Sequence, residues 1–274
     1  MSMIQTGSAD KPALALAPLS FGGAAARWRH ETMRSHDSPR LIHVTKGQGR
    51  VTVAGLTGGY GPNNLIYLPA QTLYGIELGT TVFAQILTLP DGESWPTAPF
   101  HLRLRDVHVQ KELQGLIEAI ERDLKPAGDP RAAQFHLGLL GLFVEKQCAT
   151  QHPDTIDKRR LTPAARLVAR YCALIARDFQ RGRTVADYAA DVGVTSAHLT
   201  RCCKKTCDRS ALALLHERVH FAACTLLRDT RLPIRDIASS LGFRSAAYFT
   251  RRFQAMSGHA PSAFRRHDGK VPRL

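Results

Sequence analysis

The sequence predicts a multidomain protein of α and β structure, with a β-barrel at the N-terminus, two helices after it and an all-α domain at the C-terminus. Three observations predict this. Short runs rich in Val, Ile, Leu and Thr fill the first third of the chain, the apolar period becomes helical after residue 106, and one helical motif occurs twice within Thr184–Arg266. A chain of 274 residues is long enough for about two domains.

The N-terminal region, residues 1–106, has the pattern of a small barrel or sandwich. After a loose start over residues 1–20, glycine-rich segments separate short apolar runs, as is typical of many-stranded β folds. The runs are Leu41–Thr45, Arg50–Ala54, Asn64–Leu68 and Thr81–Leu89. Their layout resembles the cupin-type barrel of many bacterial regulators. Two alternatives follow: a filled barrel that serves as a dimer scaffold, or a barrel with a pocket for one small effector.

The histidines of this region do not form a metal-binding pattern. A metal-binding cupin would offer closely paired histidines on its first strands, whereas His30, His36 and His43 are six and seven residues apart. Thr72–Tyr74 stand where a later histidine ligand would be expected. We therefore expect neither a metal nor another cofactor, and we expect the histidines to be surface or hydrogen-bonded residues.

Residues 107–152 are predicted to form an antiparallel pair of helices. One apolar stripe runs from Val109 to Leu124, a Pro- and Gly-containing segment breaks it at Lys125–Pro130, and a second stripe runs from Phe135 to Val144. These helices either only cover the barrel or also form the contact of a homodimer. The polar residues 153–162 are predicted to be a linker.

The repeated motif consists of two short helices with a glycine turn between them. Copy one is Val185–Arg201 with Gly193, and copy two is Ile234–Arg251 with Gly242. Glycine takes the turn conformation that other residues resist. This is the pattern of a helix-turn-helix, whose second helix lies in the major groove of DNA. The motifs are predicted over 184–207 and 233–257.

The second helix of each copy has a buried face and a face suited to DNA. Leu199 and Cys203 are predicted to be core residues in one copy, as are Phe249 and Phe253 in the other. Small and polar side chains on the opposite face permit close approach to base edges, and arginine can pair with guanine. The predicted DNA-binding residues are Ser196, Ala197, Thr200, Arg201 and Lys204 in copy one, and Ser245, Ala246, Ala247, Thr250, Arg251 and Gln254 in copy two.

The distribution of charge agrees with a polyanionic partner for this part of the chain. Residues 163–274 contain 20 Lys and Arg against 8 Asp and Glu, whereas residues 1–152 contain 14 and 13. An excess of positive charge that coincides with two helix-turn-helix motifs favours double-stranded DNA, and affinity should fall steeply with salt. The apolar stripe of Ser210–Arg228 predicts a helix that packs against both motifs and fixes their separation.

Residues 163–267 closely resemble the DNA-binding domain of the AraC/XylS family of bacterial transcription regulators. The resemblance rests above all on copy two, with Ile237-Ala238, Gly242-Phe243, Tyr248-Phe249, Arg251, Phe253, Gly258, Pro261 and Phe264-Arg265. It implies seven helices, base readout by Arg201 and Arg251, a homodimer, and contact with RNA polymerase. Residues 268–274 would be a tail.

Copy one departs from the family pattern at three positions. Cys203 stands where the family usually has Phe, Asp208 replaces the glycine after the helix, and Ala211 replaces a proline. These changes should loosen copy one by about 1–3 kcal/mol. We hypothesise that copy two anchors the protein on DNA and that copy one adds specificity.

The remaining alternatives concern the cysteines and the class of protein. Cys202, Cys203 and Cys207 are either packing residues or a thiol switch. The N-terminus has no signal pattern and no stretch is apolar enough to span a membrane, so we expect a cytoplasmic protein. No catalytic pair of residues stands out. A transcription regulator is therefore favoured over a cupin-type enzyme fused to DNA-binding helices and over an architectural protein whose barrel only dimerises.

Overall fold

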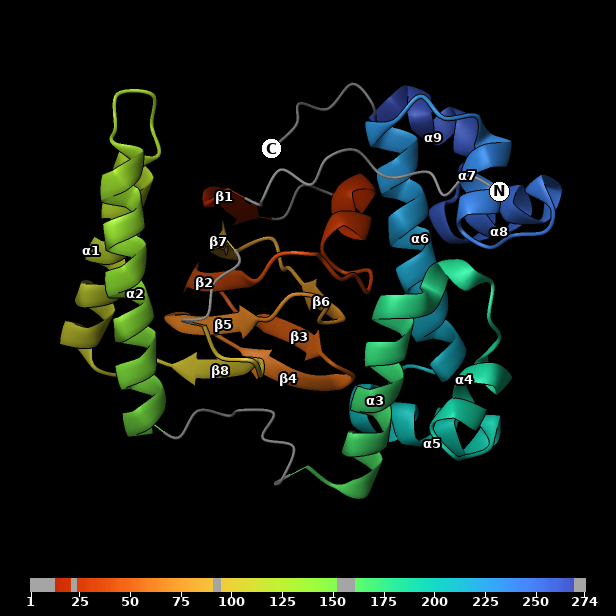
Figure 1. Ribbon diagram of the computed structural model, residues 1–274, viewed down its shortest axis with the longest axis horizontal. Helices are drawn as coiled ribbons and strands as arrows, with labels where there is room; N and C mark the ends of the chain where they lie inside the picture. Colours follow the sequence, from red (N-terminus) through yellow and green to blue (C-terminus); the bar gives the residue numbers. More distant parts are fainter. Residues whose placement is uncertain (1–12, 21–23, 91–94, 152–160, 269–274) are drawn as a thin grey trace.

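The computed structural model describes residues 13–20, 24–90, 95–151 and 161–268. Strands come first along the chain and helices follow from Val107 onward (Figure 1). The strand-rich part lies between the helix pair α1 and α2 on one side and the C-terminal helices on the other. The predicted linker lies mostly, and the predicted tail almost entirely, outside the described residues.

The strands form two antiparallel sheets. The larger sheet has the order β1 (Ala15–Ser20), β7 (Phe83–Thr88), β2 (Arg40–Lys46), β5 (Asn64–Leu68) and β8 (Phe100–Arg103). The smaller sheet has the order β4 (Leu56–Tyr60), β3 (Gly49–Val53) and β6 (Tyr74–Glu77).

The predicted closed, cupin-like barrel is not confirmed, because the described strands stay in two separate sheets. The four strands predicted from apolar runs are present as β2, β3, β5 and β7. The sequence prediction missed β1, β4, β6 and β8. Strand β1 occupies part of the segment that was predicted to be loose, and β4 contains the Gly58–Gly59 pair that was interpreted as a turn.

The two faces of the larger sheet explain why its strands contain continuous apolar runs. Ile42 and Ile66 point into a core shared with the smaller sheet, which includes Val51 and Ile76. Their neighbours in sequence point the other way, because successive side chains of a strand alternate between the two faces. Leu41, Leu65 and Tyr67 accordingly belong to a second core with the helix pair.

The helix pair consists of α1 (Val107–Asp123) and α2 (Pro130–Gln151), close to the predicted stripes. The side chain of Asp106 caps α1 by accepting hydrogen bonds from the backbone N–H groups of His108 and Val109. Leu113 and Ile117 of α1 and Leu140 of α2 face the larger sheet. The pair therefore covers the face of the sheet that lies away from the smaller sheet.

The C-terminal half is helical throughout its described residues. Its elements are α3 (Pro163–Asp178), the 3-10 turn η2 (Phe179–Arg181), α4 (Val185–Asp191), α5 (Ser196–Cys207), α6 (Ala211–Asp229), α7 (Ile234–Ser240), α8 (Ala246–Ser257) and α9 (Pro261–Asp268). Thr162 caps α3 and a proline follows it.

The strand-rich region and the helical region share one apolar core. Trp28 lies in the 3-10 turn η1 (Ala24–Arg29), and its ring centroid is 5.9 Å from that of Phe221 and 5.8 Å from that of Phe264. Met33 and Leu73 belong to the same cluster as the buried residues of α3 and α6. Trp28 thus joins the N-terminal region to both α6 and α9.

Replacing Trp28 with Ala should lower the free energy of unfolding by about 3–5 kcal/mol, because it removes a buried aromatic side chain from this shared core. Urea denaturation followed by circular dichroism measures the change. Phe83→Ala is the matched control, since that ring is half exposed and its loss should cost less than about 0.5 kcal/mol. Equal costs for the two variants would show that the two regions are not held by this contact.

Candidate nucleic-acid interface

The first motif consists of α4 and α5 joined by a turn at Gly193. Thr184 and Asp187 form a capping box at the start of α4, and the hydroxyl of Thr195 accepts a hydrogen bond from the N–H of His198 at the start of α5. Gly193 has φ of 78°, which places it in the left-handed region. The chain therefore reverses where the sequence predicted.

The second motif repeats this geometry with α7 and α8. Gly242 also has φ of 78°, and the hydroxyl of Ser245 accepts a hydrogen bond from the N–H of Tyr248 at 3.4 Å. Pro233 precedes α7 without any side-chain cap, unlike Thr184 in copy one. Thr195 and Ser245 are thus N-caps of α5 and α8, one residue outside the helices that were predicted to contain them.

The second helix of each motif has one buried and one accessible face. Leu199 and Cys203 of α5, and Phe249 and Phe253 of α8, are buried as predicted. The predicted DNA-binding residues lie on the accessible side. Those exposed are Ala197, Arg201, Lys204, Ser245, Ala246, Ala247, Arg251 and Gln254, and those half-buried are Ser196, Thr200 and Thr250.

Helix α6 connects the two motifs and packs against both. It contacts α4 and α5 on one side and α7, α8 and α9 on the other, as the sequence predicted for a rigid spacer. Leu214, Leu215, Ala223 and Leu227 are among its buried residues. Because α6 is fixed by both motifs, it sets the distance between α5 and α8 (Figure 1).

The second motif also touches the chain just before the first motif, at a pair of glycines. A Cβ atom on Gly242 would lie 2.6 Å from the Cα of Gly182 and 2.7 Å from the carbonyl oxygen of Gln180. The turn between α7 and α8 therefore touches the chain just before α4, backbone against backbone. Gly193, the equivalent turn residue of copy one, has open space around its Cβ position.

The three departures of copy one have clear structural effects. Asp208 has φ of 55°, so a non-glycine residue takes the left-handed position that Gly258 takes at the end of α8 with φ of 76°. Such a conformation costs a non-glycine residue about 1 kcal/mol. At Ala211, the start of α6 is stabilised instead by the hydroxyl of Ser210, which accepts from the N–H of Ala213 at 3.0 Å.

The cysteines pack in the core of copy one. Cys203 and Cys207 of α5 and Cys172 of α3 are buried free thiols. Burial raises the pKa of Cys203 to about 12 and holds the pKa of Cys172 well above its ordinary value. Thiols that stay protonated are poor nucleophiles and poor metal ligands, so the geometry favours the packing interpretation over the thiol switch.

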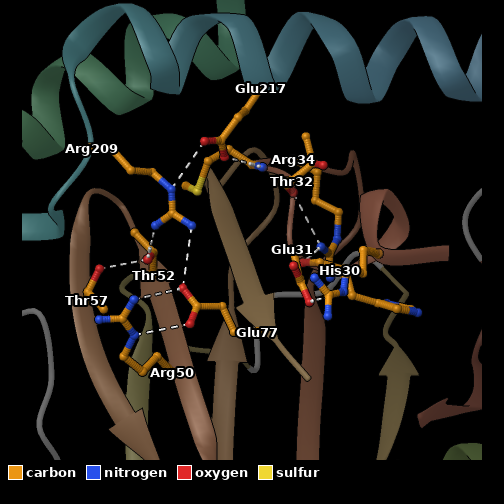
Figure 2. A network of polar contacts seen from close by, with 12 residues as sticks. His30, Glu31, Thr32, Arg34, Arg50, Thr52, Thr57, Glu77, Arg209 and Glu217 are labelled. Carbon is orange, nitrogen blue, oxygen red and sulfur yellow. Dashed lines mark hydrogen bonds and ion pairs between the residues drawn. The ribbon is translucent and has the colours of Figure 1, made fainter. Parts of the chain in front are cut away.

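A polar network joins the first motif to the smaller sheet (Figure 2). Arg209 follows α5, and its guanidinium donates to Thr52 Oγ1 at 3.0 Å and to Glu217 Oε1 at 3.3 Å. Its Nη2 lies 3.7 Å from Glu77 Oε1, and Glu77 also pairs with Arg50. Burial raises the pKa of the Glu217 carboxyl.

No pattern in the sequence predicts this network. Its members come from β3, β6, the turn after α5, and α6, and no local spacing connects them. The excess of positive charge in residues 163–274 predicts a polyanionic partner for this region. Arg209 instead contacts two carboxylates and a hydroxyl of the protein itself.

No group of three or more His, Cys, Asp or Glu residues in the described ranges lies close enough together to hold a metal ion. No helix in those ranges is long and apolar enough to cross a membrane.

The chain is similar to one known protein family and to several solved structures. Residues 188–267 match a family model described as a helix-turn-helix domain. No curated protein matches the chain. Structures of similar shape include ToxT from Vibrio cholerae, which is 12% identical over 94% of this chain and 98% of its own length, with a TM-score of 0.44. The C-terminal domain of AraT, a response regulator from Geobacillus stearothermophilus, is 26% identical over 42% of this chain and 93% of its own, with a TM-score of 0.37.

The family match and the motif residues agree on the class of the C-terminal segment. This segment is a helix-turn-helix domain, a DNA-binding unit rather than a catalytic one, and its second motif has the residues typical of the AraC/XylS family of transcription regulators. The match covers copy two completely and copy one from Tyr188 onward.

Replacing Gly242 with Ala should cost about 2–4 kcal/mol of unfolding free energy, because the added methyl group meets the backbone of Gly182 and the left-handed turn is strained as well. Gly193→Ala, which adds the same methyl group at the same φ in open space, should cost about 1 kcal/mol. Urea denaturation of both variants measures the difference. Equal costs would mean that the contact between Gly242 and Gly182 does not constrain the fold.

Proposed function

We propose that this chain is a sequence-specific transcription regulator that reads DNA with α5 and α8 together. One observation carries the proposal: the two helices bury equivalent faces and leave equivalent polar faces accessible, with Arg201 and Arg251 exposed on them. Exposed arginine beside small side chains suits contact with base edges in the major groove. Since α6 holds both helices, they would enter successive major grooves, about 34 Å apart.

The structure of the two copies supports the proposed division of labour between them. Copy two has an aromatic core, with Phe249 and Phe253 in ring contact, and a glycine at the end of its recognition helix. Copy one has Cys203 in the corresponding core position and the left-handed Asp208. A helix held by a better-packed core loses less freedom on binding, which favours copy two as the anchor.

A homodimer through α2 is the second part of the proposal. Phe135, Leu139 and Leu142 lie on one face of this helix and are 76%, 51% and 63% exposed. Gly138 lies on the same face and has open space beside it, so another helix could approach closely. An exposed apolar stripe on a helix is typical of a protein contact, and a second copy would cover both stripes at once.

The space between the two sheets favours the scaffold alternative over the effector pocket. Side chains such as Ile42, Val51, Ile66 and Ile76 fill it. A cavity of about 240 Å³ opens beside the edge strands β4 and β8, with Phe100 and His101 in its wall. Ligand pockets usually have about 300–1,000 Å³. An effector in the sheets, and contact with RNA polymerase, stay predictions from the resemblance alone.

Selection of bound duplexes from a random pool, with the full-length protein, tests the main proposal. Two enriched submotifs about one helical turn apart are expected. On the selected duplex, Arg251→Ala should weaken binding by about 1–3 kcal/mol and Arg201→Ala by less. Fluorescence anisotropy measures both affinities.

The control is Arg122→Ala, which removes an exposed positive charge from α1 and should leave affinity unchanged. Salt-sensitive binding without any enriched sequence would show that the helices hold phosphates and do not read bases. A larger loss with Arg201→Ala than with Arg251→Ala would reverse the proposed ranking of the two copies.

Replacing Leu139 with Glu should weaken dimerisation at least tenfold, because a charge would be buried in the centre of the proposed contact. Sedimentation equilibrium measures the dissociation constant. Gln134→Glu adds the same charge to the same helix outside the stripe and should leave the dimer intact. A Leu139→Glu protein that dimerises like the wild type would rule out α2 as the contact.

A further inference from the structure

A large cleft lies between the two motifs, along α6. Its volume is about 940 Å³, and its walls come from the start of α4 and Thr200 of α5 on one side, and from α8 and the turn before it on the other. This is within the usual size of a small-molecule site. The predicted base-reading arginines Arg201 and Arg251 are not in its lining, whereas Thr200 and Ser245 of the predicted DNA-reading faces are, so the cleft borders those faces.

Apolar side chains make up most of the exposed wall. Leu212 and Val219 of α6 lie opposite Tyr248 and Met256 of α8. Leu212 and Tyr248 are about half exposed, although both are large and apolar. Apolar surface gains free energy when it is removed from water. A phosphate backbone would not provide apolar cover for these side chains, whereas an organic ligand would.

The charge of the lining is entirely positive. None of its residues is an Asp or Glu, and three are arginines, Arg183, Arg244 and Arg252. Arg183 is already held by Asp191 at 2.7 Å. Arg252 donates to Nδ1 of His216, and its Nε has no hydrogen-bond partner among the described residues.

His216 does not neutralise Arg252. Burial, together with the charge of Arg252, lowers the pKa of His216 to about 4, so the imidazole is uncharged at neutral pH and accepts the hydrogen bond. Arg252 therefore brings a positive charge into an apolar cleft without a carboxylate to balance it. A guanidinium in this setting binds carboxylate oxygens well, because it offers several N–H donors in a fixed fork.

We propose that the cleft between the motifs binds an amphipathic organic anion, with its carboxylate on Arg252 and its apolar body between Leu212 and Tyr248. The chemical class follows from the two halves of the lining. The apolar wall needs a hydrocarbon or aromatic body, and Arg252 needs an acidic head group.

The position of the cleft couples the ligand to DNA binding. Thr200 of α5 and Tyr248 of α8 both line it, so a bound molecule contacts both recognition helices. Because Thr200 also belongs to the predicted DNA-reading face of α5, a bound ligand should change the affinity for DNA, and DNA should then change the affinity for the ligand by the same factor. This coupling, unlike the site itself, rests on the proposed function.

Isothermal titration of the full-length chain with three matched probes tests the site: 2-naphthoate, the uncharged 2-naphthamide, and the cationic 2-naphthylmethylammonium. We expect one 2-naphthoate per chain, bound at least tenfold more tightly than the other two. In Arg252→Gln the preference for the acid should disappear. In Arg235→Gln, which removes an exposed charge of α7 outside the cleft, it should persist.

Equal binding of acid and amide, or an unchanged preference in a folded Arg252→Gln protein, would overturn the site. If Arg252→Gln does not fold, Leu212→Glu tests the site instead, because this half-exposed position tolerates a polar side chain. The added carboxylate should weaken 2-naphthoate binding at least tenfold. Displacement of 2-naphthoate by any duplex regardless of sequence would assign the cleft to the DNA backbone and also overturn the site.

The coupling has its own measurement. Saturating 2-naphthoate should shift the midpoint of binding to the selected duplex at least threefold, and an unchanged midpoint would remove the coupling. A protein that binds 2-naphthoate as expected but binds no duplex would refute the proposed function and leave the ligand site standing.

Discussion

The burial of helix α6 is the constraint on which the rest of this structure depends. Both motifs pack against it, and the N-terminal region reaches it through Trp28 and through Ser35, whose hydroxyl accepts a hydrogen bond from the buried Arg218 at 3.0 Å. The guanidinium of Arg218 also lies 3.7 Å from the ring centroid of Phe179. A helix with so many partners cannot rotate or shift alone, so the spacing of α5 and α8 is a property of the whole fold rather than of the motifs.

The two copies of the motif have the same backbone geometry but contact different parts of the structure. Both copies have the same turn glycine geometry, yet only Gly242 presses against another part of the chain. Copy one is instead held from the N-terminal side, where Arg209 joins the end of α5 to Glu77 and Thr52 (Figure 2). Charged contacts of this kind are more sensitive to their environment than an aromatic core. Copy one, which has the weaker core, is thus the copy that makes polar contacts with the smaller sheet.

The sequence predicted the features that depend on residues close together in the chain, such as helix periodicity, caps and turns. The periodicity of residues 185–257 placed both motifs within one or two residues, because caps and turn glycines are short-range signals. The same reasoning missed the four edge strands β1, β4, β6 and β8. Proline in β1 and glycine in β4 and β6 weaken the strand pattern, and β1, β6 and β8 pair with strands that are distant in sequence. It also predicted a closed barrel where two sheets form. The cleft beside Arg252 and the network around Arg209 arise from contacts between elements, and no spacing in the sequence encodes them.

The shared core has a consequence for how the chain is made. The contact of Trp28 with Phe221 and Phe264 spans about 190 to 240 residues, so it cannot form until the chain as far as Phe264 has left the ribosome. Until then the N-terminal sheets must keep an apolar surface open to water, where a chaperone or another nascent chain could reach it. The arrival of α9 therefore completes the second motif and closes this surface in the same event.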